Sequence, residues 1–163
     1  MNYQLYESFL GPLLLFSDGS ALKRVTFLAS RHDFIPDDEP LSGESDAILT
    51  AACQQLDEWF SGMRRNFDLP LAPEGTPFQK EVWKALQTIP YGTTCSYGEL
   101  AGQLGRPSAS RAVGAANGCN PIALIIPCHR VIGADGSLTG YAFGIERKQK
   151  LLNFEAQLQL SLI

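Results

Sequence analysis

The sequence predicts a mixed α/β (α+β) fold, in which a small antiparallel sheet precedes a mostly helical second half. Short apolar runs separated by turn dipeptides occupy residues 1–28, as in β-hairpins. Apolar residues then recur at helical spacing, and helix start signals follow residue 75. With 163 residues, 45% of them hydrophobic and 18% charged, the chain is long enough for one domain or two small ones.

The first half contains three candidate strands and one candidate helix. The candidate strands are residues 3–9, 13–16 and 21–28. The dipeptides Gly11-Pro12 and Asp18-Gly19 favour turns between these strands. Residues 31–43 are rich in Asp, Pro and Ser, which predicts an exposed loop. Residues 45–60 carry apolar side chains at helical spacing, so we expect an amphipathic helix there.

A proline-rich stretch at residues 69–75 predicts a linker, and the charge balance changes sign close to it. Residues 1–77 contain five Lys/Arg and twelve Asp/Glu, a net charge of −7, whereas residues 78–163 contain eight and five, a net charge of +3. We therefore expect two domains, residues 1–75 and residues 76–163. The local positive charge keeps nucleic acid open as a partner of the second domain, although a solvated acidic domain beside a near-neutral one is the simpler interpretation.

The second domain begins with a clear helix start signal. Thr76-Pro77-Phe78-Gln79 combines an N-cap threonine, a proline at the first helical position and a capping-box glutamine. We expect this helix to continue to about Thr88 and to end before Ile89-Pro90-Tyr91-Gly92.

Two further helices are expected, the first opened by the capping box Ser96-Tyr97-Gly98-Glu99 and ending at Leu104. After the turn Gly105-Arg106-Pro107, Ser108 would cap the next helix, which runs to about Asn117. Two short helices joined by a tight turn suggest a helix-turn-helix unit. Two packed helices without a DNA role fit the same pattern.

The last of these helices has small side chains and one arginine. The small residues are Ala109, Ser110, Ala112 and Gly114. They permit tight packing or a close approach to a shallow, narrow groove. Arg111 lies in the first turn, where the helix dipole disfavours a cation, and such a departure suggests a functional role. The alternative is that Arg111 lies over Tyr97 or pairs with a carboxylate.

Composition also bears on location and cofactors. No apolar run approaches the roughly 20 residues that cross a bilayer, and the N-terminus lacks the pattern of a secretion signal. The four cysteines form no C-x-x-C pair and there are only two histidines, which argues against a disulfide scaffold and a zinc finger. We expect a cytoplasmic monomer with reduced thiols, no membrane contact and no metal.

The most informative segment is an apolar run over residues 122–126 that precedes Pro127, Cys128 and His129. The run predicts a buried, strand-like segment. A cysteine is a strong nucleophile only as the thiolate, and an adjacent imidazole can remove its proton. In an extended chain neighbouring side chains point to opposite sides, so the proton would pass through a bridging water. A buried cysteine with only a packing role is the alternative.

A histidine that acts as a base needs a carboxylate or carbonyl to set its tautomer. The downstream carboxylates that could orient His129 are Glu146 and Glu155. Spacing alone leaves both open.

Pro127-Cys128-His129-Arg130-Val131 resembles the active-site signature of the O6-alkylguanine-DNA alkyltransferases, also called methylated-DNA–protein-cysteine methyltransferases. Further matching segments cover about residues 76–155, in the order found in the family. They are Thr76-Pro77-Phe78-Gln79, Val82-Trp83, Ile89-Pro90-Tyr91-Gly92, Ser96-Tyr97-Gly98, Arg111-Ala112-Val113-Gly114, Asn117-Gly118, Asn120-Pro121, Val131-Ile132-Gly133, Thr139-Gly140-Tyr141 and Arg147-Lys148. The resemblance implies a ribonuclease-H-like first domain and a winged helix-turn-helix in the second.

The resemblance also implies an activity: irreversible transfer of the alkyl group from O6-alkylguanine, and from O4-alkylthymine, in duplex DNA to Cys128. The helix face formed by Ala109, Ser110, Ala112 and Gly114 would enter the minor groove. Arg111 would fill the gap left by the flipped nucleotide. No metal or other cofactor is needed.

Roles for the remaining site residues follow from the same resemblance. His129 would act as base through water, and Glu155 would orient it. Asn120 would hold the backbone near Cys128. Tyr97 would rotate the 3′ phosphate and donate a proton to the departing guanine. The guanine amino group would donate to the carbonyls of Cys128 and Val131, and Tyr141, Ala142 and Phe143 would complete the substrate pocket.

One segment departs from the family, which usually has two or three glycines after the residue matching Tyr141. Here Ala142 and Phe143 take those places. Ala142 keeps the backbone amide that would face the O6 oxygen, but Phe143 adds a large ring at the pocket rim. Either small alkyl groups are still accepted, or the loop is shifted, or the Phe143 ring points to the protein surface.

Two other classes of protein remain alternatives. A Cys–His hydrolase would share the thiolate and imidazole but would also need an oxyanion hole and repeated turnover. A helix-turn-helix regulator, or a lesion-binding relative without chemistry, would bind DNA but lack the nucleophile, which Cys128 argues against.

Overall fold

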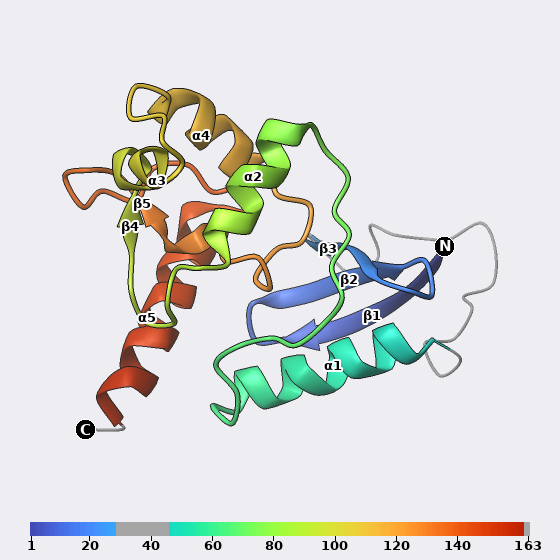
Figure 1. Cartoon of the computed structure of the whole chain (residues 1–163). Helices are drawn as coiled ribbons and strands as arrows, with labels where there is room; N and C mark the ends of the chain where they lie inside the picture. Colours follow the sequence, from blue (N-terminus) through green and yellow to red (C-terminus); the bar gives the residue numbers. More distant parts are fainter. Residues whose placement is uncertain (29–45, 162–163) are drawn as a thin grey trace. The chain divides into compact units, whose positions relative to one another are not determined.

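The computed structural model describes residues 1–28 and 46–161, and their chain path is shown in Figure 1. Two compact units are formed, one by residues 1–74 with 121–123 and the other by residues 75–120 with 124–163. The first unit holds a sheet and one long helix, and the second is mostly helical. The predicted mixed α/β fold is confirmed.

An antiparallel sheet forms the first unit, in the order β1-β2-β3. Its strands are β1 (Asn2–Ser8), β2 (Gly11–Ser17) and β3 (Leu22–Phe27). Gly11 adopts a φ of 115°, which the tight β1–β2 connection requires. The Asp18 carboxylate accepts hydrogen bonds from the backbone of Ser20 and Ala21, an Asx-type turn that joins β2 to β3. The three predicted strands are confirmed, and the predicted loop over residues 31–43 lies outside the described residues.

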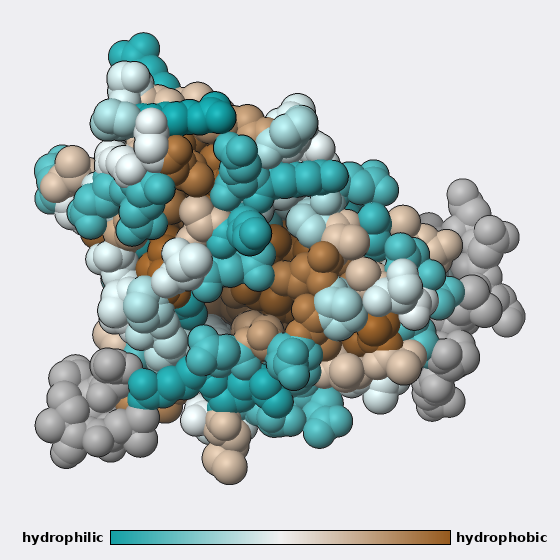
Figure 2. All heavy atoms as spheres, viewed as in Figure 1, coloured by the Kyte–Doolittle hydropathy of each residue, from teal (hydrophilic) through white to brown (hydrophobic). Residues whose placement is uncertain are grey.

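The amphipathic helix of the first unit is α1 (Ala47–Phe60). The Asp46 carboxylate caps it by accepting hydrogen bonds from the backbone N–H groups of Ile48 and Leu49. Its buried residues are Leu49, Ala52, Leu56 and Trp59. Figure 2 shows teal, hydrophilic residues along α1 at the foot of the view, as expected for the opposite face of such a helix.

The second unit begins with α2 (Pro77–Leu86), and the Thr76–Gln79 capping box is confirmed in both directions. A Cβ on Gly75 would lie 2.4 Å from the Trp83 ring, so only glycine fits immediately before this helix. The helix ends two residues earlier than expected, because Thr88 N–H donates to the Ala85 carbonyl in a tighter, 3₁₀-like turn.

A helix-turn-helix arrangement follows, made of α3 (Tyr97–Gln103) and α4 (Ser110–Gly118). Ser96 caps α3 by accepting from the Glu99 N–H at 3.0 Å. The predicted Ser108 cap is wrong: α4 begins after Ala109, which offers no side-chain cap. The reason is a turn in which Ala109 N–H donates to the Arg106 carbonyl at 2.9 Å, so the chain becomes helical only from residue 110.

The remaining elements are β4 (Cys95–Ser96), which pairs in parallel with β5 (Val131–Ile132), and α5 (Ile145–Ser161). The strand-like segment expected over residues 122–126 is buried but not a strand. Ile122 forms only an isolated parallel bridge with Val25, and residues 123–125 form a turn in which Leu124 has a φ of 70°, which no strand permits. Within the described residues, no helix has the length and apolar content needed to span a bilayer.

Candidate active site

Cys128 lies at the start of a short 3₁₀ helix, η2 (Cys128–Arg130), between the buried turns and β5. Its backbone N–H donates to the Ile126 carbonyl at 2.8 Å, and the residue is 4% exposed. The extended conformation expected for Cys128 and His129 is therefore wrong. In a 3₁₀ helix successive side chains are about 120° apart, so Cys128 and His129 still point in different directions.

His129 is paired with a buried carboxylate on α5. Its Nε2 lies 2.8 Å from Oε1 of Glu155, and the two side chains are 0% and 1% exposed. Of the two carboxylates left open by the sequence, Glu146 instead forms an exposed ion pair with Lys150. Burial alone would raise the pKa of Glu155, but the hydrogen bonds and charges of His129 and Arg130 lower it to about 2.

These contacts set the tautomer of His129. Because Glu155 is ionised at neutral pH, it can only accept, so the proton of the neutral imidazole lies on Nε2. Burial lowers the pKa of His129, which favours this neutral form. Nδ1 is buried and has no hydrogen-bond partner among the described residues. Its free lone pair is the proton acceptor that a base requires.

The resting state of Cys128 is the thiol. Burial raises the pKa of the Cys128 thiol, although a hydrogen bond from Asn120 and the charge of Lys148 act in the opposite direction. A buried thiol becomes a nucleophile only when a nearby base removes its proton. The unprotonated Nδ1 of His129 is suited to that step.

Two asparagines hold the backbone on either side of the nucleophile. Asn120 Nδ2 donates to the Ile126 carbonyl at 2.9 Å, and Asn117 Nδ2 donates to the Cys128 carbonyl at 3.3 Å. Asn117 is the penultimate residue of α4, so this bond ties α4 directly to η2. In the sequence, Asn117 lies in a segment that matches the family, but the resemblance implies no role for it at the site.

Arg130 is a second group that sequence reasoning missed. Its guanidinium contacts Glu155 with nitrogen–oxygen distances of 2.8–3.1 Å, donates to the Ile89 carbonyl and lies over the Tyr91 ring. Glu155 therefore holds two cationic or protonated partners at once. The sequence feature that could have indicated this role is the charge of Arg130 within the signature Pro127-Cys128-His129-Arg130-Val131.

The residues expected to contact DNA lie on α4, except Ala109, which is the residue just before it. Arg111 and Ala112 are exposed, whereas Ala109, Ser110 and Gly114 are half-buried. No carboxylate among the described residues pairs with Arg111, so the predicted alternative of an ion pair finds no support there. The half-burial of Gly114 has a specific cause, since a Cβ there would contact the Tyr97 ring at 3.6 Å.

Tyr97 and Tyr141 differ in their hydrogen bonds. Tyr97 Oη donates to the Thr139 carbonyl at 2.9 Å. Tyr141 Oη is buried and has no partner among the described residues, and burial raises the pKa of this phenol well above its usual value. Tyr141 is thus a donor left free at the site.

Phe143 is half-buried and packs edge-on against Tyr141, with ring centroids 5.5 Å apart. The ring is therefore partly exposed, and this placement is compatible with both the pocket-rim position and the surface-facing alternative. Ala142 is exposed.

The carbonyls expected to receive the guanine amino group are partly occupied. Cys128 O accepts from the Val131 N–H and from Asn117, which uses both of its lone pairs. Val131 O accepts from Lys148 Nζ at 2.5 Å. The Val131 carbonyl therefore has the greater remaining capacity for a substrate.

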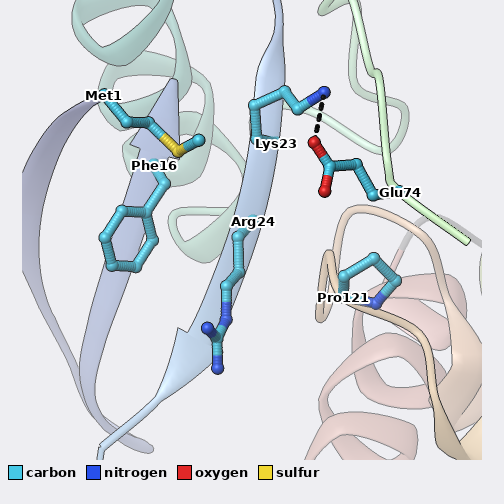
Figure 3. Close-up of a pocket in the computed structure, with 6 residues that line it drawn as sticks. All are labelled: Met1, Phe16, Lys23, Arg24, Glu74 and Pro121. Carbon is cyan, nitrogen blue, oxygen red and sulfur yellow. Dashed lines mark ion pairs between the residues drawn. The ribbon is translucent and has the colours of Figure 1, made fainter. Parts of the chain in front are cut away.

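A pocket in the first unit contains none of the predicted site residues. Its lining residues are Met1, Phe16, Lys23, Arg24, Glu74 and Pro121. Figure 3 shows Lys23 and Glu74 facing each other, joined by an ion pair of 3.5 Å. Within the part of the chain that the structure describes, no group of three or more His, Cys, Asp or Glu residues could hold a metal ion.

Both units match families of known proteins. Residues 77–157 match the 6-O-methylguanine DNA methyltransferase DNA-binding domain, and residues 1–73 match the ribonuclease-like domain of the same proteins. A methylated-DNA–protein-cysteine methyltransferase of Methanosarcina acetivorans is 51% identical over 156 residues, which cover 95% of this chain and 98% of the relative. One from Mycobacterium tuberculosis is 50% identical over 160 residues, covering 95% and 92%.

Solved structures give the same result. The crystal structure of Mycobacterium tuberculosis OGT in complex with DNA superimposes with a TM-score of 0.84 at 49% identity, covering 97% of this chain and 94% of that one. An O6-methylguanine DNA methyltransferase from Methanococcus jannaschii superimposes with a TM-score of 0.70 at 29% identity, covering 94% and 93%.

Proposed function

Since the chain belongs to the 6-O-methylguanine DNA methyltransferase family, we propose that it repairs duplex DNA by transferring the alkyl group of O6-alkylguanine to Cys128. O4-alkylthymine is a second substrate of the same chemistry. The observation that carries the proposal is the buried His129–Glu155 pair at 2.8 Å, because it leaves an unprotonated Nδ1 on the residue that directly follows the buried Cys128. Each molecule reacts once, since a thioether cannot be hydrolysed by this site.

The reaction is a displacement at the alkyl carbon. The Cys128 proton moves to His129 Nδ1 through a water, and Glu155 stabilises the imidazolium that forms. The thiolate then forms a C–S bond while the bond from the alkyl carbon to O6 breaks, and its electron pair passes to the guanine. Tyr97 donates a proton to the departing base, and Asn120 keeps the Cys128 backbone in place.

DNA binding is assigned to α4. Its small residues allow the helix to approach a shallow groove closely, and the exposed Arg111 is free to fill the space of a flipped nucleotide. The Asn117 bond to the Cys128 carbonyl links this helix to the nucleophile. The substrate pocket is lined by Tyr141, Ala142, Phe143 and the Val131 carbonyl.

The proposal is tested by the intact mass of the protein after mixing with a duplex that contains O6-methylguanine. We expect a single permanent gain equal to one CH₂ group, located on Cys128 by peptide mapping. Repeated turnover without a mass change would indicate a hydrolase. Binding without either result would indicate a lesion-binding protein that performs no chemistry.

Arg111→Ala should slow repair in duplex DNA by at least about tenfold, because extruding a base costs a few kcal/mol and the plug is lost. Free O6-benzylguanine needs no flipping, so its reaction should be nearly unchanged. The measurement is the rate of Cys128 alkylation by each substrate, with Lys150→Ala as a control for loss of an exposed cation. Equal slowing with both substrates would mean that Arg111 supports the substrate pocket or the folded structure rather than base flipping.

Phe143→Gly should raise the rate with O6-benzylguanine relative to O6-methylguanine DNA. A phenyl ring packed against Tyr141 competes with a benzyl group for space, and overpacking typically costs about 1–3 kcal/mol, or roughly tenfold to a hundredfold in rate. Phe143→Leu, with a smaller apolar side chain, should give an intermediate ratio. If the benzyl-to-methyl ratio is the same in all three proteins, the ring does not guard the pocket.

A further inference from the structure

Asn117 is a buried polar residue of the second unit, with an exposed fraction of 4%. It is the penultimate residue of α4, the helix to which DNA binding is assigned. Its Nδ2 donates to the Cys128 carbonyl at 3.3 Å, which places the side-chain amide directly against the backbone of the nucleophile. The function proposed above uses only this bond.

The oxygen of the same amide has no partner. Asn117 Oδ1 is buried and accepts no hydrogen bond from the described residues. The bond from Nδ2 fixes which end of the amide is the oxygen, because the reverse orientation would turn Oδ1 toward the Cys128 carbonyl and make two acceptors face each other. A buried carbonyl oxygen without a donor is unfavourable and rare in folded proteins. This free acceptor therefore indicates a donor that a bound ligand supplies.

The amino group of guanine is such a donor, and its expected binding position lies beside Asn117. Of the two carbonyls expected to receive it, that of Cys128 already accepts from the Val131 N–H and from Asn117 Nδ2. A carbonyl oxygen engaged twice has no lone pair left for the base. Asn117 Oδ1 belongs to the amide that covers this carbonyl, so it is the acceptor that remains free at the same place.

We propose that Asn117 Oδ1 accepts a hydrogen bond from the exocyclic amino group of the alkylated guanine, which makes Asn117 a determinant of base specificity. This rests on the proposed function. The second amino hydrogen is left for the Val131 carbonyl. Thymine and hypoxanthine have no amino group at this position, so each leaves Oδ1 buried without a donor. Alkylated guanine is therefore the preferred substrate, and O4-alkylthymine the poorer one.

The test compares two duplexes, one with O6-methylguanine and one with O6-methylhypoxanthine, which is the same base without the amino group. Single-turnover alkylation of Cys128 is followed by intact mass. The unchanged protein should react about two- to tenfold faster with methylguanine, the range for the net contribution of one neutral hydrogen bond. The ratio of the two rates cancels any effect that a variant has on the nucleophile itself.

Asn117→Leu keeps the volume that covers the Cys128 carbonyl but removes the acceptor, so the ratio should fall to unity. Asn117→Asp should retain the preference, because a carboxyl group buried against a carbonyl is protonated, donates to that carbonyl and keeps an accepting oxygen. Asn153→Leu replaces an exposed asparagine on α5 and should behave like the unchanged protein. An unchanged ratio in folded Asn117→Leu would overturn the proposal and assign the amino group to backbone carbonyls.

A second measurement leaves Asn117 in place, in case Asn117→Leu does not fold. In the non-reacting Cys128→Ser protein, the side-chain amide resonances of Asn117 are compared by NMR between the two duplexes. They should differ, because a donor at Oδ1 polarises the amide N–H groups. Equal resonances would mean that a water or no donor occupies this position, which refutes the proposal.

The same mass measurements separate this inference from the proposed function. If neither duplex adds mass to Cys128 of the unchanged protein, the proposed function fails, and this inference fails with it. If both duplexes add mass and Asn117→Leu keeps the ratio of the unchanged protein, only this inference fails.

Discussion

Cys128→Ser is expected to reduce methyl transfer below detection while leaving the affinity for a methylguanine duplex nearly unchanged. Affinity is assigned to α4, whereas the chemistry requires a thiolate, and a serine hydroxyl loses its proton far less readily. The change removes little volume from a residue that is 4% exposed, so the fold should persist. Transfer is measured by intact mass, and affinity by titration of a labelled duplex.

Cys119→Ser is the matched control for this experiment, because Cys119 is an exposed free cysteine at the end of α4. It should react like the unchanged protein. An equal loss of transfer and binding in Cys128→Ser, with normal behaviour of Cys119→Ser, would mean that Cys128 is structural.

Glu155→Gln should have the second largest effect, because one carboxylate serves both His129 and Arg130. The substitution keeps the size of the side chain but leaves the buried Arg130 charge uncompensated, which typically costs about 3–5 kcal/mol. It also removes the anion that stabilises the imidazolium, so transfer should slow as well. Denaturant unfolding and single-turnover transfer measure the two losses.

Glu146→Gln controls for charge on the same helix, since Glu146 is exposed and pairs with the equally exposed Lys150. It should change neither stability nor rate by a measurable amount. If Glu155→Gln behaves the same way, the buried pair does not support the site.

The pH dependence of stability follows from the same carboxylate. The pKa of Glu155 is about 2 in the folded protein against an ordinary value of 4.5, so its contribution is present above pH 4.5 and is lost as the pH falls toward 2. The difference corresponds to roughly 3 kcal/mol. The pKa of Asp18 is also lowered to about 2, so Asp18 loses its contribution to stability in the same pH range. The contribution of Glu155 is therefore obtained by subtracting the pH dependence of the unfolding free energy of Glu155→Gln from that of the unchanged protein.

The sequence by itself determined several features that depend on neighbouring residues, although the equally local cap expected at Ser108 was wrong. The turns at Gly11 and Asp18 and the capping box at Thr76 involve contacts within four residues, and the structure contains all of them. The placement of a candidate nucleophile next to a candidate base, Cys128 and His129, is covalent and needs no fold. The family resemblance added expected roles for site residues that lie farther from Cys128 and His129 in the sequence.

Only the tertiary structure decided the features that depend on residues far apart in the chain. The apolar run over residues 122–126 would suit a buried strand, but the structure turns it, with Leu124 at a φ of 70°. Sequence spacing gave no preference between Glu146 and Glu155 as the partner of His129. In the structure, α5 packs against η2 and places Glu155 against His129. An ion pair, a raised thiol pKa and the charge of Lys148 have large energetic effects only because these groups are buried. Burial arises from packing between elements rather than from local sequence.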